Sequence, residues 1–230
     1  MSGGLRALLV SLQLTDSAFP SGMYTLSHGL EGFAQAKAVT AESMPELLAD
    51  LLRHSVGPAD ATALAVAHRA ASAGDWDALV EVDERLHASK LNRELRLAST
   101  RTGRQLLDTA RLALGGEAVD RYADLVAGKR TPGCQAVAAG VVYAANGVPV
   151  DQAVASDLFA FCVSFTGAAL RLRLTDHRRA QVTLRETAGV IEAVTAAALR
   201  RELADLGGCV PMADVMSGRH ERAEARMFAT

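Results

Sequence analysis

The sequence predicts an all-α fold: a single-domain bundle of about eight to ten helices with a charged C-terminal tail. Half of the 230 residues are hydrophobic but only 4% are aromatic. The apolar share is therefore mostly Ala, Leu and Val, which suits closely packed helices. Apolar residues recur at helical spacing along most of the chain, and no strand alternation is visible. The length allows one sizeable core, and no repeat or long linker divides it.

The first part of the chain contains helices separated by a corner. A leucine stripe predicts a helix from about Leu5 to Leu14. The segment Phe19–Gly22 contains Pro and Gly and is expected to end that helix. Apolar residues return at helical spacing over residues 26–33, so a second helix is expected there. Ser43 to Glu46 has the form of a capping box, with Pro in the first turn, and predicts the start of a third.

Glycine and capping signals delimit the middle of the chain. Gly57-Pro58 is expected to end the third helix and to start another, which stops at Gly74. Asp75 is the expected N-cap of the next helix. A longer helix is predicted from about Leu91 to Leu114, where a Gly-Gly pair ends it.

The remaining helices are predicted in the same way. We expect a short helix over Val119–Ala127, another over Pro132–Ala145, and a long apolar helix over Asp151–Thr175 that Asp151 caps. Thr183 to Glu186 resembles a second capping box and predicts a helix that runs to about Leu206.

The pattern changes at Gly207-Gly208. We therefore expect an all-helical domain over residues 1–208 and a partner-binding tail over residues 209–230. The tail is highly charged but ends in the apolar pair Met227-Phe228. That combination predicts a mobile segment that only a partner orders, with Phe228 as the anchor.

Composition excludes several classes of protein. A net charge of −2 gives no general attraction to nucleic acid or to a membrane surface. The apolar run Ala153–Leu170 is interrupted by Asp157, so we interpret it as a buried core helix. Cysteines are few and widely spaced, and no disulfide framework follows from them. No secretory leader is visible, so a cytoplasmic location is expected.

No motif indicates catalysis or cofactor binding. The sequence has no phosphate-binding loop and no nucleophile elbow. None of the six histidines stands four residues from another histidine or a cysteine, as a helical metal site would need. We therefore expect a protein that is not an enzyme, with no catalytic, cofactor-binding or metal-ligating residues.

Two stretches concentrate polar residues. Asp16–Glu31 follows its Pro-Gly corner with Tyr24, Ser27, His28 and Glu31, which fits either a capped helix start with satisfied core residues or a functional segment. The second stretch is basic and includes Arg93, Glu94, Arg96 and Arg104. It could be a solvated helix face, a nucleic-acid stripe or a protein interface. No aromatic residue is interleaved for base stacking, and arginine pairs well with carboxylates.

Both stretches, together with the tail, resemble motifs of the UreF family of urease accessory proteins. The first matches its N-terminal signature, the second its central motif and the tail its closing motif. The matching residues are Leu14, Asp16, Ser17, Phe19, Pro20, Gly22, Tyr24, Ser27, Gly29, Leu30 and Glu31; then Glu94, Arg96, Ser99, Gly103, Arg104 and Leu106; and finally His220, Glu221, Arg226, Met227 and Phe228. The three motifs occur in the family's order and span the chain.

The resemblance implies an all-helical, non-enzymatic scaffold for nickel insertion into urease. Members dimerise, bind the accessory protein UreD (also called UreH), recruit the GTPase UreG and dock on apo-urease. The residues expected to bind partners are Tyr24, Ser27, His28, Glu31, Arg93, Glu94, Arg96, Arg104, His220, Glu221, Arg226 and Phe228. The alternative is an α-helical nucleic-acid-binding or regulatory protein that uses the Arg93–Arg104 stripe.

Three positions depart from the family pattern. Thr131 stands where His or Tyr is usual, Leu174–Gln181 lacks the usual Pro and Gly, and Glu224 replaces a common Tyr. If these segments contact partners, their affinities are expected to differ from those of relatives.

Overall fold

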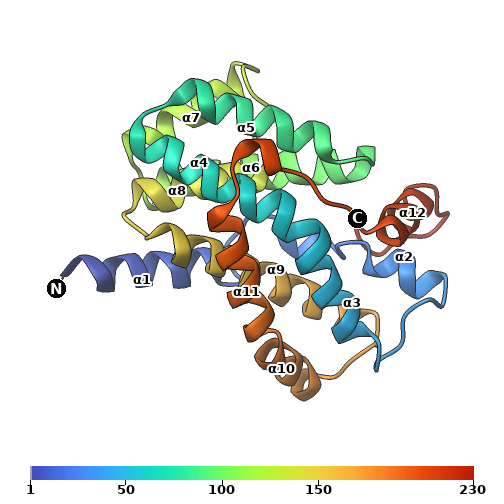
Figure 1. Ribbon diagram of the computed structural model, residues 1–230. Coiled ribbons are helices and arrows are strands. Elements are labelled where there is room, and N and C mark those ends of the chain that lie inside the picture. Colours follow the sequence, from blue (N-terminus) through green and yellow to red (C-terminus); the bar gives the residue numbers. More distant parts are fainter. Residues whose placement is uncertain (1) are drawn as a thin grey trace.

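The computed structural model describes residues 2–230, with side chains from residue 4, and shows helices but no strand in that range (Figure 1). The all-α prediction is confirmed. The α-helices are α1 (Ser2–Thr15), α2 (Leu30–Gln35), α3 (Met44–Leu51), α4 (Thr62–Ala73), α5 (Trp76–Ser89), α6 (Arg93–Ala113), α7 (Glu117–Ala127), α8 (Gln135–Ala145), α9 (Val150–Arg171), α10 (His177–Glu186), α11 (Ala188–Arg200) and α12 (Pro211–His220). Shorter segments are the 3₁₀ turns η1 (Met23–Thr25) and η3 (Leu203–Asp205) and the π-helix η2 (Leu52–Ala61).

Helix α8 lies at the centre of the bundle and packs most extensively on α4 and α6. A glycine permits each close approach. A Cβ on Gly140 would lie 2.7 Å from the Leu64 carbonyl oxygen of α4, and one on Gly103 of α6 would collide with the Gly133 carbonyl. The absence of a side chain at Gly103 therefore lets α6 pack closely on the start of α8. These contacts place α6 firmly against the core, so its outer face has a fixed position.

The predicted break at Gly57-Pro58 is wrong. Helix α3 continues through η2 into α4 without interruption. The wider π-helical turn accommodates Pro58, which cannot donate a main-chain hydrogen bond. Two further hydrogen bonds reach this turn: the Thr62 hydroxyl donates to the Gly57 carbonyl at 3.1 Å, and the Gly207 N–H donates to the Pro58 carbonyl at 3.1 Å.

Several predicted helix starts also differ. The helix expected over residues 26–33 begins only at Leu30, because Gly29 and His28 adopt positive φ angles of 86° and 56°. Asp176 caps α10 by accepting main-chain hydrogen bonds, so the Thr183–Glu186 pattern lies at a helix end rather than a start. Asp151 lies in the first turn of α9, and Pro149 takes the N-cap position. The Ser43 side chain makes no cap hydrogen bond within its helix.

Helix α9 is long and apolar enough to cross a membrane by length and composition. In the structure it packs on α1, α8, α10 and α11, and it buries Leu158, Cys162 and Phe165. It is the core helix that the sequence predicted.

The C-terminal segment, residues 209–230, is not a separate charged tail. Residues 211–220 form α12, which lies beside α2 (Figure 1), and the following residues return to the body of the protein. Phe228 is 4% exposed and His220 is fully buried. The prediction of a segment that only a partner orders is wrong in the structure, because His220 and Arg226 contact carboxylates of the same chain and Phe228 is buried.

Candidate functional site

The two polar stretches and the C-terminal segment, far apart in sequence, meet at one place, which we call the three-segment junction. It consists of residues 24–31, the first turns of α6, and residues 217–230. Its central residues are the buried carboxylates Glu31 and Glu94 and the buried imidazole of His220. The meeting brings together Tyr24, Ser27, Glu31, Glu94, His220, Arg226 and Phe228 of the predicted site.

Glu31 holds the C-terminal segment at the start of α2. Its carboxylate accepts the main-chain N–H groups of Met227 at 2.8 Å and Phe228 at 3.0 Å. One of its oxygens also lies 2.8 Å from Nε2 of His220. Burying a carboxylate is costly unless it is fully hydrogen-bonded, and these contacts satisfy both oxygens.

Glu94 makes the matching contacts from α6. One oxygen lies 3.1 Å from Nδ1 of His220, and the other accepts a hydrogen bond from Arg226 at 2.7 Å. The two ring nitrogens of His220 thus face two different carboxylates. Both are satisfied as donors only in the imidazolium form.

Local geometry positions these groups. A Cβ on Gly32 would lie 2.6 Å from the Met216 carbonyl oxygen, so the absence of a side chain there lets α12 approach α2. Ser27 donates its main-chain N–H and its hydroxyl to the Thr230 carbonyl oxygen. The C-terminal segment is therefore held by hydrogen bonds at Thr230 as well as at Met227 and Phe228.

Arg171 of α9 closes the outer side of the junction. Its guanidinium lies 4.1 Å from the ring centroid of Tyr24 and 4.2 Å from that of Phe228. Both distances are typical of cation–π contacts. Phe228 is thus an anchor within this chain, while Tyr24 is exposed. Sequence reasoning missed Arg171, because nothing in the α9 pattern indicates what its last turn meets.

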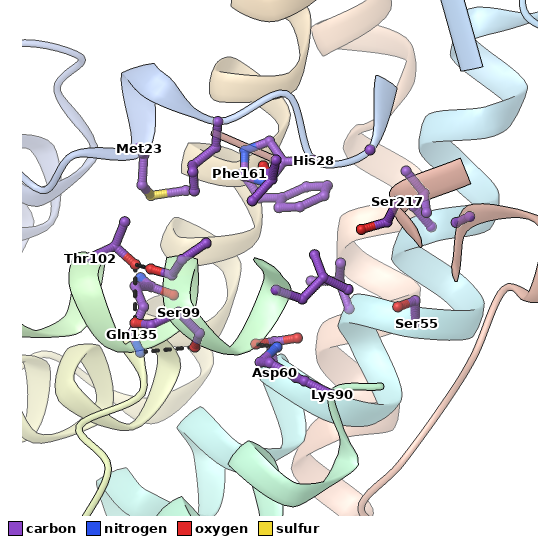
Figure 2. Close-up of a pocket in the computed structure, with 18 of the residues that line it drawn as sticks. Met23, His28, Ser55, Asp60, Lys90, Ser99, Thr102, Gln135, Phe161 and Ser217 are labelled. Carbon is purple, nitrogen blue, oxygen red and sulfur yellow. Dashed lines mark hydrogen bonds and ion pairs between the residues drawn. The ribbon is translucent and has the colours of Figure 1, made fainter. Parts of the chain in front are cut away.

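A cavity of about 150 Å³ adjoins the junction (Figure 2). Its wall contains the Lys90–Asp60 ion pair, 2.7 Å long, and Asp157, which accepts a hydrogen bond from Gln135 at 2.8 Å. The buried hydroxyls of Ser217 and Thr230 also line it and have no hydrogen-bond partner among the residues that the structure describes. Asp157 had a sequence signal, as the charge that interrupts an apolar run.

Burial shifts the pKa values of two residues in this wall: it lowers that of His28 and raises that of Asp157. Burial, with Arg171 and Lys90 nearby, lowers the pKa of His28 to about 3, so its ring is neutral. Its Nε2 lies 2.8 Å from the Ser164 hydroxyl oxygen, and its ring packs 4.4 Å from that of Phe161. Burial raises the pKa of Asp157 to about 6, against the opposing effect of the Gln135 hydrogen bond. In both residues the uncharged form is favoured.

The remaining predicted residues of α6 and the C-terminal segment divide into two groups. Arg93 and Arg104 are exposed on the outer face of α6, and Glu221 lies half-buried near them. Arg96 instead turns back and donates to the carbonyl oxygens of Lys90 and Leu91. Of the three arginines predicted to bind partners in the basic stretch, Arg93 and Arg104 therefore face solvent, whereas Arg96 does not contribute to a basic surface.

The positions that depart from the family pattern have different roles. Thr131 is buried and donates its hydroxyl to Asp83 at 2.6 Å, so it serves the interior. Asp176, within Leu174–Gln181, caps α10. Glu224 is exposed. Among the described residues, no cluster of three or more His, Cys, Asp or Glu side chains has the geometry of a metal site.

Comparison with known proteins gives one consistent result. The UreF family profile matches residues 38–188. Urease accessory protein UreF 2 of Brucella canis is 30% identical over 225 residues, which cover 97% of this chain and 92% of the relative. Urease accessory protein UreF of Bradyrhizobium diazoefficiens is 34% identical over 92% of this chain and 86% of its own length. The protein of the same name from Trichodesmium erythraeum is 32% identical over 96% of both chains.

Proposed function

This chain belongs to the UreF family of urease accessory proteins, and we propose that it is a non-enzymatic scaffold for nickel insertion into urease. In this role it binds the accessory protein UreD/UreH, recruits or regulates the GTPase UreG, and docks on apo-urease in the cytoplasm. Nickel is the cargo of the assembly rather than a resident cofactor of this chain.

The observation that supports this proposal best is the three-segment junction. Each of the three motifs that resemble the family contributes to one buried hydrogen-bonded network. A network of two buried carboxylates and a buried histidine is expensive to build. Its evident effect is to fix α2, α6 and the C-terminal segment relative to one another. A fixed surface made from three segments is what a scaffold needs.

The junction divides the predicted partner-binding residues by role. Ser27, Glu31, Glu94, His220 and Phe228 are buried, so we propose that they hold the binding surface in place. The exposed residues make the direct contacts; they are Tyr24, Arg93, Arg104 and Arg226, with Glu221 partly exposed. His28 and Arg96 are internal supports of the two polar stretches.

We also propose that the protein is a homodimer. Helix α1 projects from the body (Figure 1) and exposes a stripe of leucines, namely Leu5, Leu8, Leu9 and Leu12. Phe159 of α9 is exposed too. Leucines at this spacing form one apolar helix face, which a second copy would cover. Sedimentation of the wild-type chain and of a Leu8→Glu/Leu12→Glu variant tests this; a monomeric wild type contradicts it.

The scaffold function is tested by co-purification and activation. The chain is tagged at its N-terminus, because Phe228 and Thr230 are buried at the other end, and it is co-expressed with UreD/UreH, UreG and apo-urease. We expect all three to co-purify and urease to become nickel-loaded. His220→Ala should reduce co-purification and activation, whereas His177→Ala, at an exposed histidine of α10, should not. Normal activation without this chain would refute the proposal.

A further inference from the structure

A groove of about 680 Å³ runs along the outer face of α6. We call it the α6 groove. One wall is α6 itself, with Arg93, Leu97, Arg101 and Arg104. The other is the end of the C-terminal segment, including Glu221 and Arg226. The groove is therefore shared between the second and third segments of the junction.

The groove is basic on a chain that is slightly acidic overall. Its lining contains four arginines and two glutamates, a net charge of +2, while the whole chain has a net charge of −2. Glu94 is already bonded to His220 and Arg226 and is buried below the surface. Arg93 and Arg104 form none of the ion pairs found among residues 4–230. Their guanidinium groups are free to pair with carboxylates.

An apolar side chain lies among these cations. Leu97 is 52% exposed and stands four residues from both Arg93 and Arg101, so the three share one helix face. A cation–leucine–cation pattern is complementary to a segment that carries carboxylates around an apolar residue. Nucleic acid fits less well, since no aromatic side chain lines the groove for stacking and glutamates are present.

We propose that the α6 groove binds an acidic, amphipathic segment of a protein partner in the urease-maturation assembly. Its carboxylates pair with Arg93 and Arg104, and its apolar residue packs on Leu97. This inference rests on the proposed scaffold function, and it specifies the chemistry of one of the contacts through which the scaffold would bind a partner. Arginine forks that face solvent on one side and a low-dielectric helix surface on the other give such pairs both affinity and register.

The groove depends on the junction beneath it. Arg226 reaches the groove only because Glu94 holds its guanidinium, and the chain around it is held by Glu31 and His220. Release of the C-terminal segment removes one wall while leaving the α6 arginines in place. Loss of the junction should therefore weaken binding at the groove without any change in those arginines.

The direct test uses fluorescence anisotropy with the full chain and three labelled probes. They are a helical peptide of Glu, Leu and Ala, the same peptide with Gln for each Glu, and a single-stranded DNA oligonucleotide. We expect the Glu peptide to bind most tightly. Arg93→Glu/Arg104→Glu should weaken it about tenfold or more, as expected for the loss and reversal of close charge pairs. His220→Ala should weaken it less.

The control makes the same charge change elsewhere. Arg130→Glu/Arg185→Glu alters two exposed arginines outside the groove lining and should leave peptide binding within about twofold. No binding of the Glu peptide, an equal loss in the control variant, or tighter binding of the oligonucleotide each overturns the proposal.

Co-purification separates this inference from the scaffold function. If Arg93→Glu/Arg104→Glu loses the peptide but keeps all accessory partners, the groove is not a partner site, although the scaffold function stands. If the wild-type chain recruits no accessory protein, the scaffold function fails, whatever the peptide result.

Discussion

Two regions of the protein bury carboxylates and satisfy them in different ways. Asp83 of α5 is fully buried, and its carboxylate accepts four hydrogen bonds at 2.6–2.9 Å from neutral donors, namely the Tyr122 and Thr131 hydroxyls and the Gly133 and Cys134 N–H groups. Glu31 and Glu94 are also buried, but both contact the imidazole of His220, and Glu94 also pairs with the Arg226 guanidinium. Neutral donors alone surround Asp83, whereas the junction adds a shared imidazole and a guanidinium to the two main-chain donors of Glu31.

The difference lies in what each carboxylate connects. The donors to Asp83 lie 39–51 residues away, on α7 and the loop before α8, within the packed core. The partners of Glu31 and Glu94 lie 126–197 residues away, on a segment with an exposed side. We infer that Asp83 supports the fold itself. The junction instead fixes one segment on a fold that already exists, so it can open without global unfolding.

The largest effect is expected from Asp83→Ala. The substitution leaves four buried donors without an acceptor, and each unsatisfied group costs about 1–3 kcal/mol. We expect the free energy of unfolding to fall by about 4 kcal/mol or more, as measured by denaturant titration. Glu84→Ala, an exposed neighbour on α5, should change it by less than about 0.5 kcal/mol. If Asp83→Ala lowered the free energy of unfolding as little as Glu84→Ala does, Asp83 would not support the fold in the way that we infer.

The second prediction concerns His220→Ala. It leaves Glu31 and Glu94 buried without the imidazole that both contact, at an expected cost of about 3 kcal/mol. Because the junction can open locally, amide exchange should accelerate over residues 211–230 and at the start of α2 while α4 and α8 keep their protection. Hydrogen-exchange mass spectrometry against His177→Ala measures this. Uniform acceleration across the chain would show that the junction is part of the core.

The third prediction compares arginines at one site. Arg226 is 41% exposed and pairs with a buried carboxylate, so Arg226→Ala should cost about 1 kcal/mol. Arg104 is exposed without such a partner, and Arg104→Ala should stay within about 0.5 kcal/mol. Thermal melts of the two variants are compared directly. Equal losses of stability in the two variants would mean that pairing with Glu94 does not make Arg226 more stabilising than Arg104.

Signals that act within a few residues predicted the fold well. Gly74 ends α4 in the left-handed conformation, and Asp75 caps α5 through a 3.0 Å bond to Ala78, both as expected. The prediction of helix boundaries failed where contacts between residues far apart in the sequence determine the local structure. Pro58 stays inside a helix that widens into a π-helical turn, and its carbonyl accepts a hydrogen bond from Gly207, far away in sequence; no local pattern contains that information.

The same limit applies to the candidate site. The sequence identified Glu31, Glu94 and His220 as members of three separate motifs, but their meeting depends on pairing across more than a hundred residues. Charge density in the C-terminal segment suggested disorder, because a sequence does not show whether a charge is neutralised within the fold. Arg171 had no signal, since its two ring partners come from opposite ends of the chain.

The smallest effect, and the only stabilising one, is expected at a third buried carboxylate. Asp157 has one side-chain donor, Gln135, where Asp83 has four donors, and burial raises its pKa from 3.8 to about 6. Between pH 4 and 6 the folded chain therefore binds more protons than the unfolded chain, and stability falls as pH rises through that window. Above it, the folded state retains an ionised, poorly satisfied group.

Asp157→Asn removes that ionisation while keeping the shape of the side chain. We expect a small rise in Tm at pH 7.5 and none at pH 4, because the protonated acid and the amide are alike in charge. Asp151→Asn, exposed on the same helix, should show no such pH-dependent gain. A loss of stability at pH 7.5 would mean that the Asp157 anion has an unrecognised partner in the cavity. The number of hydrogen-bond donors would then not explain why substitutions of Asp83 and Asp157 change stability in different ways.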